Sequence, residues 1–224
     1  MNSWLHRFAL LAVHVIAALL PMLLGWGVSS WRSFLAEPAR AGLVTAILGG
    51  ACLLLVLRMD LNPLRRGESF ARGQAILLLV LLAASLGLLV WLPWADRAGI
   101  AVFRPQFVRW LGLGMCMAGG AIRLLALRRL GEHFSAYVTL QPGHRLVEDG
   151  IYAWIRHPLY LSLLLAGPGV ALVFRSELVW PILFVALAFV TDRIRKEETL
   201  LASHFGGNFA QYRARSWALL PHIY

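Results

Sequence analysis

The sequence predicts an all-α membrane protein, a polytopic transmembrane helical bundle of five to six spans that ends in a C-terminal helical hairpin. Two observations support this fold class. Hydrophobic residues make up 59% of the 224 residues and charged residues only 14%, whereas soluble domains are about 45–50% apolar and about 25% charged. Apolar runs of nearly 20 residues, the length of a helix that spans a bilayer, recur along the chain. The composition therefore excludes an ordinary soluble domain.

Six apolar segments are expected to form the helices. They are residues 5–28, 41–57, 74–94, 107–127, 157–174 and 178–191. The last two are short and are joined only by the sequence FRSE, which predicts a tight hairpin with Pro168 and Pro181 kinking its arms. If an arm stops short of crossing the bilayer, the bundle has five spans rather than six. In the fourth segment, Gly112, Cys116 and Gly119 share one helix face, which indicates close helix packing.

The distribution of basic residues predicts the orientation in the membrane. With six spans, fourteen of the 21 Lys and Arg residues fall on the side that holds both termini and the second and fourth loops, and six fall on the other side. By the positive-inside rule the fourteen face the cytoplasm. The loops are short and divide the charge among them, which favours contact with anionic membrane lipids and argues against nucleic-acid binding.

Several classes of site have no support in the sequence. No zinc-type spacing of His, Cys or Glu occurs, and neither a P-loop nor a G-x-S-x-G elbow is present, so no metal is expected. Acidic residues are nearly absent from the first four spans, which argues against an ion-coupled transporter. Cys52 and Cys116 both lie in apolar segments and are expected to be packing residues.

The stretch HRLVEDGIYAWIRHPLY, residues 144–160, is the first candidate site. Gly150 permits a tight turn, and Pro158 suits the first turn of a helix. Free backbone N–H groups around Leu159 and Tyr160 are expected to face a polar ligand. The rings of Tyr152, Trp154 and Tyr160 offer faces for a flat ring or a cation. An interfacial belt explains some of these residues but not all of them within so short a stretch.

The stretch TDRIRKEETLLASHFGGNFAQY, beginning at Thr191, is the second candidate. Here the last apolar segment continues without a break into a charged helix. Arg193 and Glu197 are four residues apart and share a helix face. They form either an ordinary surface ion pair or, if they face the bundle near the membrane, part of a site.

The C-terminal ninety or so residues resemble the isoprenylcysteine carboxyl methyltransferase family, which is related to membrane phospholipid and thiol methyltransferases. The matching motifs are LGEHFSAYV (130–138), HRLVEDGIYAWIRHPLYLS (144–162), RIRKEETLLASHFG (193–206) and YRARSWALLPHI (212–223). The family often has Gly at the position of Ser162, and a different pair at Glu148–Asp149. The resemblance implies a single integral membrane domain over 1–224, with variable N-terminal helices over 1–104 and a methyltransferase core over 105–224.

The resemblance also implies S-adenosylmethionine as cofactor, covered by a cytoplasmic loop and tail, and a lipid-like methyl acceptor that enters from the bilayer. The cofactor-binding residues it implies are His144, Arg145, Leu146, Val147, Gly150, Tyr152, His157, Pro158, Leu159, Tyr160 and Glu197. Arg193 would bind the acceptor, and Arg193, Glu197 and His157 would serve catalysis.

The first expected reaction is O-methylation of a prenylcysteine-like carboxylate, with Arg193 holding the acceptor through a charge-assisted pair. An amine acceptor, as in phospholipid N-methylation, would need His157 or Glu197 as a base. A small thiol acceptor would need its thiolate stabilised. A non-catalytic membrane protein that retains the fold is the alternative from a different class.

Overall fold

The computed structural model describes residues 3–56, 72–130 and 146–221, and these residues are helical apart from short links and two isolated β-bridges. The long helices are α1 (Ser3–Trp26), α3 (Pro38–Val56), α4 (Arg72–Ala98), α5 (Phe107–Leu130), α6 (Pro158–Val173) and α7 (Val179–Phe205). Shorter elements are η1 (Val28–Ser30), α2 (Trp31–Leu35), η3 (Gly150–Ala153) and α8 (Gly207–Ala214). Each of the six apolar segments thus forms one long helix.

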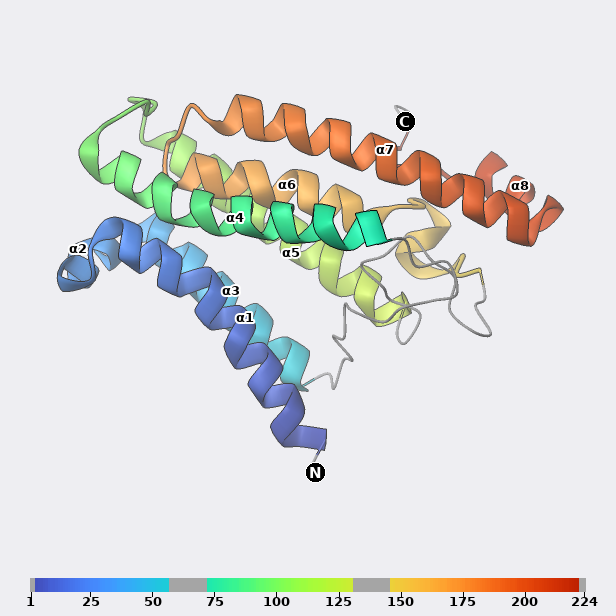
Figure 1. The fold of residues 1–224 in the computed structure, drawn as a ribbon, viewed down its shortest axis with the longest axis horizontal. Coiled ribbons are helices and arrows are strands. Elements are labelled where there is room, and N and C mark those ends of the chain that lie inside the picture. The colour runs from blue at the N-terminus through green and yellow to red at the C-terminus, as the bar shows by residue number, and fades with distance from the viewer. Residues whose placement is uncertain (1–2, 57–71, 131–145, 222–224) are drawn as a thin grey trace.

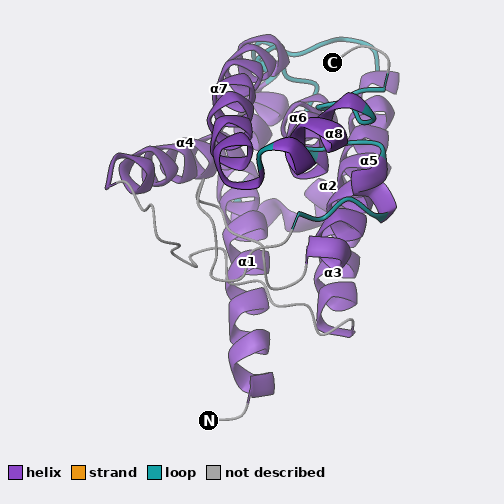
Figure 2. Ribbon diagram, turned by 90° about the vertical axis from the view of Figure 1, so that its right-hand side faces the viewer, coloured by secondary structure: helices purple, strands orange, loops and turns teal. Residues whose placement is uncertain are grey.

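The helices diverge from one end of the molecule. In Figure 1 the axes of α4, α6 and α7 are roughly aligned, with α7 running opposite to α6, whereas α1 and α3 approach them near α2 and spread away toward the N-terminus. In the view of Figure 2, α4 projects to one side of α6 and α5. We call the end that contains α2 and the α6–α7 turn the Asp96 end, and the end where α6 begins the site end.

Close packing of α5 against α6 forms the most extensive helix contact. A Cβ at Gly112 would lie 2.5 Å from the carbonyl oxygen of Gly169, and a Cβ at Gly119 would lie 2.9 Å from that of Ser162. Two glycines of α5 therefore let the two backbones touch, as the glycine pattern predicts. The remaining packing pairs are mainly α1 with α4, α6 with α7, and α3 with α5.

Two apolar clusters fill the interior, one toward each end. At the Asp96 end, Met22, Phe34 and Phe174 are almost fully buried with their neighbours. At the site end, Val190 and Ile194 of α7 pack against α6. The charged second half of α7 is therefore anchored to the hairpin through apolar residues.

The protein is a multi-pass membrane protein with three to four candidate spans. Residues Pro38–Val56, Leu79–Ala98 and Phe107–Leu130 are long and apolar enough to cross a membrane, and α1 with α2 forms a fourth candidate bent by 93°. The helix α6 is apolar but shorter, with 16 residues. Pro168 lies inside α6 as expected, whereas Pro181 falls in the first turn of α7, where a proline does not kink a helix.

Candidate active site

The site end of the α6–α7 hairpin gathers three of the predicted side chains. His157 is buried and immediately precedes Pro158, the first residue of α6. The hydroxyl of Tyr160 donates to Glu197 Oε2 of α7 at 2.9 Å. His157 Nδ1 lies 3.9 Å from the same oxygen, and the His157 and Tyr160 ring centroids are 5.7 Å apart. One carboxylate oxygen of α7 thus faces two rings carried by the start of α6.

Arg193 lies one turn before Glu197 on α7 and joins the same group. Its side chain contacts the Tyr160 hydroxyl and lies 5.9 Å from the centre of the Phe189 ring. The residue is only 5% exposed, so it does not form an ordinary surface pair with Glu197. A buried arginine is costly at the edge of a membrane bundle, which favours a functional role.

Glu198, which the sequence reasoning did not single out, is the most heavily bonded acid at this end. Its Oε1 accepts from Arg156 Nε at 2.9 Å and from His157 Nε2 at 3.2 Å, and its Oε2 lies 3.5 Å from Arg213 Nε. Burial alone would raise the pKa of Glu198, but the hydrogen bonds from His157 and Arg156 outweigh burial and lower the pKa to about 2.

The two adjacent acids differ in exposure. The Glu197 side chain is 36% exposed, whereas that of Glu198 is 13% exposed. Neighbouring helix positions point about 100° apart, so one acid faces the mouth of the hairpin and the other faces the segment before α6. Sequence spacing from Arg193 favoured Glu197 and contained no signal that Glu198 holds His157.

The C-terminal tail pairs with the segment that carries His157. The backbone N–H of Trp217 donates to the Trp154 carbonyl at 3.0 Å, and the N–H groups of Arg156 and His157 donate to Trp217 and Ala218 at 2.8 and 3.0 Å. These bonds form a short parallel pairing. The orientation of His157 is therefore fixed on its backbone side by the tail and on its ring side by α7.

Side chains strengthen this pairing. The Arg156 guanidinium donates to the carbonyl oxygens of Arg213, at 3.2 Å, and of Ser216. The Tyr212 hydroxyl donates to the Tyr152 carbonyl at 2.7 Å. Tail and loop thus lie against each other beside the hairpin, although the sequence alone did not predict which parts of them meet.

The loop residues predicted to bind a cofactor lie partly at this site. Gly150 has a φ of +60°, and a Cβ there would lie 2.7 Å from Arg129 Nε, so both the turn and the close contact require glycine. Leu146 and Val147 are half-buried. Tyr152 is buried, and this burial, together with the charge of nearby Glu197, raises the pKa of its hydroxyl.

One expectation about the start of α6 is wrong for Tyr160. The N–H of Tyr160 is not free for a ligand, because it donates to the His157 carbonyl at 3.1 Å. The chain turns tightly enough at Pro158 to satisfy this donor locally. Trp154, whose ring was also expected to offer a face, is 64% exposed.

Some predicted residues lie outside the described parts of the chain. These are His144, Arg145 and nearly all of the LGEHFSAYV motif. Within residues 3–56, 72–130 and 146–221, no group of three or more His, Cys, Asp or Glu side chains is arranged to hold a metal ion.

Arg123, inside the apolar segment 107–127, is a further candidate that the sequence analysis did not single out. Its side chain is exposed and makes no hydrogen bond or ion pair with another described residue. The glycine contacts of α5 run antiparallel along α6, so Arg123, four residues beyond Gly119, lies at the level of Tyr160. A charge inside a span is a signal that could have identified it.

The fold and site define a class: a multi-pass helical membrane protein whose polar site lies at the mouth of a two-helix hairpin. The sequence model of the isoprenylcysteine carboxyl methyltransferase (ICMT) family matches residues 110–203. This segment of the chain is therefore similar to that family, as the motifs predicted. His157, Tyr160, Arg193 and Glu197 all lie within the match.

Curated relatives show the same similarity. Protein-S-isoprenylcysteine O-methyltransferase of Schizosaccharomyces pombe is 35% identical over 116 residues, covering 50% of this chain and 48% of the relative. The Homo sapiens enzyme of that name is 32% identical over 142 residues, covering 58% and 49%. The Tribolium castaneum enzyme is 31% identical over 122 residues, covering 52% and 43%. The matches thus span about half the length of these relatives.

A solved structure supports the fold. The eukaryotic intramembrane Ras methyltransferase ICMT superposes with a TM-score of 0.60, covering 100% of this chain and 79% of that chain at 21% identity. At this identity the likeness concerns the fold alone, and it includes the N-terminal helices that the family model does not match.

Proposed function

We propose that this protein is an S-adenosylmethionine-dependent integral membrane methyltransferase that O-methylates the carboxylate of a prenylcysteine-like lipidic acceptor. The observation that carries the proposal is the meeting of Tyr160 with Arg193 and Glu197 at the mouth of the hairpin. This meeting lies inside the segment that matches the methyltransferase family. The relatives named above carry the same activity in their names.

The residues at the site end fit the cofactor. Glu197 is acidic, partly exposed and bonded to Tyr160 through one oxygen, which leaves acceptor capacity for an ammonium or hydroxyl group. The face of an aromatic ring such as that of Tyr160 attracts a cationic sulfonium. When bound, S-adenosylmethionine supplies a methyl group activated on that sulfonium. We assign to cofactor binding His144, Arg145, Leu146, Val147, Gly150, Tyr152, His157, Pro158, Leu159, Tyr160 and Glu197.

The acceptor side of the site is basic. Arg193 is buried, and its planar guanidinium suits a carboxylate. Arg123, at the level of Tyr160, adds a second positive charge from α5. A carboxylate is already ionised at neutral pH, so these residues need only bind and align it while the apolar helices exclude water. His157 and Glu197 complete the catalytic group by holding Tyr160 and the cofactor in place.

We also propose how this site is placed in the membrane. The loop before α6, the tail and both termini face the cytoplasm, supported by the fourteen-to-six division of basic residues. The helices α6 and α7 add to the candidate spans to give five or six, and residues 105–224 form the catalytic core. A water-soluble cofactor and a lipid-like acceptor from the bilayer then meet where α6 enters the membrane.

The test combines cofactor titration with methyl transfer to a prenylcysteine substrate in purified protein. Wild type should bind S-adenosylhomocysteine and methylate the substrate. Arg193→Lys should retain cofactor binding and lose about tenfold or more in turnover, because lysine keeps the charge without the planar fork. Arg195→Lys, an exposed neighbour on α7, is the matched control and should behave as wild type. Absence of S-adenosylhomocysteine binding would overturn the proposal in favour of a non-catalytic protein.

The pH dependence separates the acceptor classes. A carboxylate acceptor gives a rate that is flat across neutral pH and depends strongly on Arg193. A phospholipid amine or a small thiol must first lose a proton, so either gives a rate that rises with pH. A rising rate with little dependence on Arg193 would reassign the acceptor and leave the cofactor proposal intact.

A further inference from the structure

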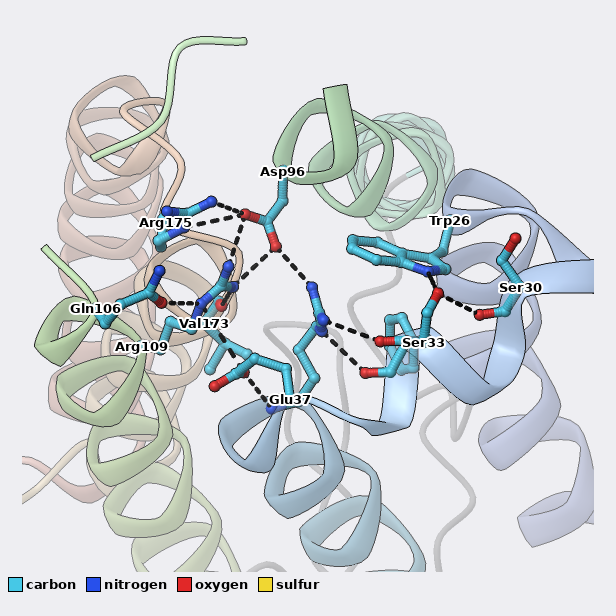
Figure 3. Close-up of polar contacts among 11 residues, drawn as sticks. Trp26, Ser30, Ser33, Glu37, Asp96, Gln106, Arg109, Val173 and Arg175 are labelled. Carbon is cyan, nitrogen blue, oxygen red and sulfur yellow. Dashed lines mark hydrogen bonds and ion pairs between the residues drawn. The ribbon is translucent and has the colours of Figure 1, made fainter. Parts of the chain in front are cut away.

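At the end of the molecule opposite the site, the carboxylate of Asp96 binds three arginines (Figure 3). Its Oδ2 accepts from Arg40 Nη1 at 3.1 Å and from Arg109 Nη1 at 2.8 Å. Its Oδ1 accepts from Arg109 Nη2 at 3.0 Å and from Arg175 Nε and Nη2 at 3.1 and 3.0 Å. The Asp96 side chain is 0% exposed, so these arginines compensate the cost of burying its charge.

The three arginines connect Asp96 of α4 to three other parts of the chain. Arg40 belongs to α3 and also donates to the carbonyl oxygens of Phe34, at 2.9 Å, and Ser33, at 3.2 Å, in α2. Arg109 belongs to α5 and donates to the carbonyl oxygen of Val173, the last residue of α6, at 2.7 Å. One arm therefore reaches the N-terminal helices, and another fixes the end of α6.

The third arm holds the α6–α7 turn itself. Arg175 has a φ of +51°, a left-handed conformation that is costly for a residue with a side chain. The Arg175 carbonyl accepts from Phe103 N at 2.7 Å, and Glu177 N donates to the Ala101 carbonyl at 2.9 Å. The turn is thus clamped to the α4–α5 link by its backbone and to Asp96 by the Arg175 guanidinium.

We propose that Asp96, acting through Arg175, is a remote positioning residue for the active site, an inference that rests on the proposed function. The two sides of the site belong to different helices of the hairpin: Tyr160 lies on α6 and Glu197 lies on α7. The turn sets the register of α6 against α7. The 16 residues of α6 extend about 24 Å from the turn to the site. A change at the turn therefore shifts Tyr160 against Glu197.

The test compares two of the arginines that bind the Asp96 carboxylate, in the full chain. Arg175→Gln removes the arm that holds the turn, and Arg40→Gln, the matched control, removes the arm that holds α3. The Arg40 side chain is 7% exposed and that of Arg175 is 17% exposed. A purely structural role therefore predicts at least as large an effect from Arg40→Gln as from Arg175→Gln. The positioning role predicts the reverse at the site.

The first readout is independent of activity. Spin labels are attached at Leu163→Cys on α6 and Leu187→Cys on α7, both 44% exposed, after Cys52→Ser and Cys116→Ala. The distribution of distances between the labels should shift or broaden in Arg175→Gln and match wild type in Arg40→Gln. Arg175→Lys, which keeps the charge, should restore a distribution closer to wild type than Arg175→Gln gives.

The second readout is S-adenosylhomocysteine affinity. It should fall by about tenfold or more in Arg175→Gln, since small displacements in a site are costly, and stay within about twofold in Arg40→Gln. An unchanged label distance in Arg175→Gln, or equal changes in both variants, would overturn the inference. If wild type binds no cofactor, the proposed function fails, and the label distances still decide whether Asp96 sets the hairpin.

Discussion

The two polar clusters of this molecule are both built from arginines and acids, yet they differ in how completely they are satisfied. At the Asp96 end, the fully buried carboxylate accepts from three arginines, and Arg40 and Arg109 also bind backbone carbonyls. At the site end, Glu197 stays 36% exposed and bonds Tyr160 through one oxygen. A closed cluster stabilises the fold, whereas an open one retains capacity for a ligand.

The largest effect is expected at the closed cluster. Asp96→Asn leaves three arginines with no full negative charge at their centre and should lower the free energy of unfolding by about 3–5 kcal/mol. Thermal unfolding in detergent measures this loss. Asp192→Asn is the control, since Asp192 is 52% exposed and pairs with Lys196 one turn away. Equal melting temperatures for the two variants would contradict the description of Asp96 as a closed centre.

An intermediate effect on stability is expected from Glu198. This acid is largely buried, like Asp96, but it lies at the site end beside the partly exposed Glu197. Glu198→Gln weakens the bonds from Arg156 and His157 and should cost about 1.5–3 kcal/mol of stability at neutral pH. Folding lowers the pKa of this carboxyl from its ordinary 4.5 to about 2. Its contribution is therefore complete above about pH 4.5 and is lost as the pH falls toward 2.

Acid unfolding curves of wild type and Glu198→Gln test this prediction. Wild type should lose stability between about pH 4.5 and 2 in excess of the loss shown by the variant. The control is Glu148→Gln, which removes a more exposed acid paired with Arg215. Parallel wild-type and Glu198→Gln curves would show that Glu198 does not stabilise the fold in its charged form.

The smallest effect on stability is expected at the open cluster. Glu197→Gln should change the free energy of unfolding by about 0.5 kcal/mol or less, since a partly exposed acid contributes little. Cofactor affinity should nevertheless fall about tenfold, because a charge-assisted bond to the ligand is lost. Titration with S-adenosylhomocysteine beside thermal unfolding measures both. A large loss of stability with unchanged cofactor affinity would show that Glu197 stabilises the fold, as Asp96 does, and does not bind the cofactor.

The sequence predicted the helices better than the contacts between them. Apolar length and turn residues were sufficient for all six long helices, and Pro158 begins α6 as expected. The Asp96 cluster was not predicted, because its partners lie 56, 13 and 79 residues away from Asp96 in the chain. Arg40, Arg109 and Arg175 belong to the six basic residues on the opposite side of the predicted bundle, and the orientation rule accounts for them without any pairing. Only the packed helices show that these charges converge.

The candidate site was predicted in part, through the resemblance and through local patterns. Tyr160, Arg193 and Glu197 lie together, as residues carried by two adjacent motifs should. The interaction of Glu198 with His157 was missed, because adjacent acids on a helix offer no signal of which one faces which neighbour. The tail pairing was missed as well, since a backbone hydrogen bond leaves no mark on the side chains that form it. His144 and Arg145 remain predictions.

The pairing of the tail with the His157 segment has a consequence for how the protein is made. Arg156 and its partner Ser216 are 60 residues apart, and the hairpin α6–α7 lies between them in the chain. During synthesis α6 therefore leaves the ribosome well before the tail residues that pair with the segment in front of it. The pairing that holds His157 is completed only after the hairpin has left the ribosome, so a nascent chain stalled inside α8 would already have the long helices α1 to α7 and still lack the backbone bonds that orient His157.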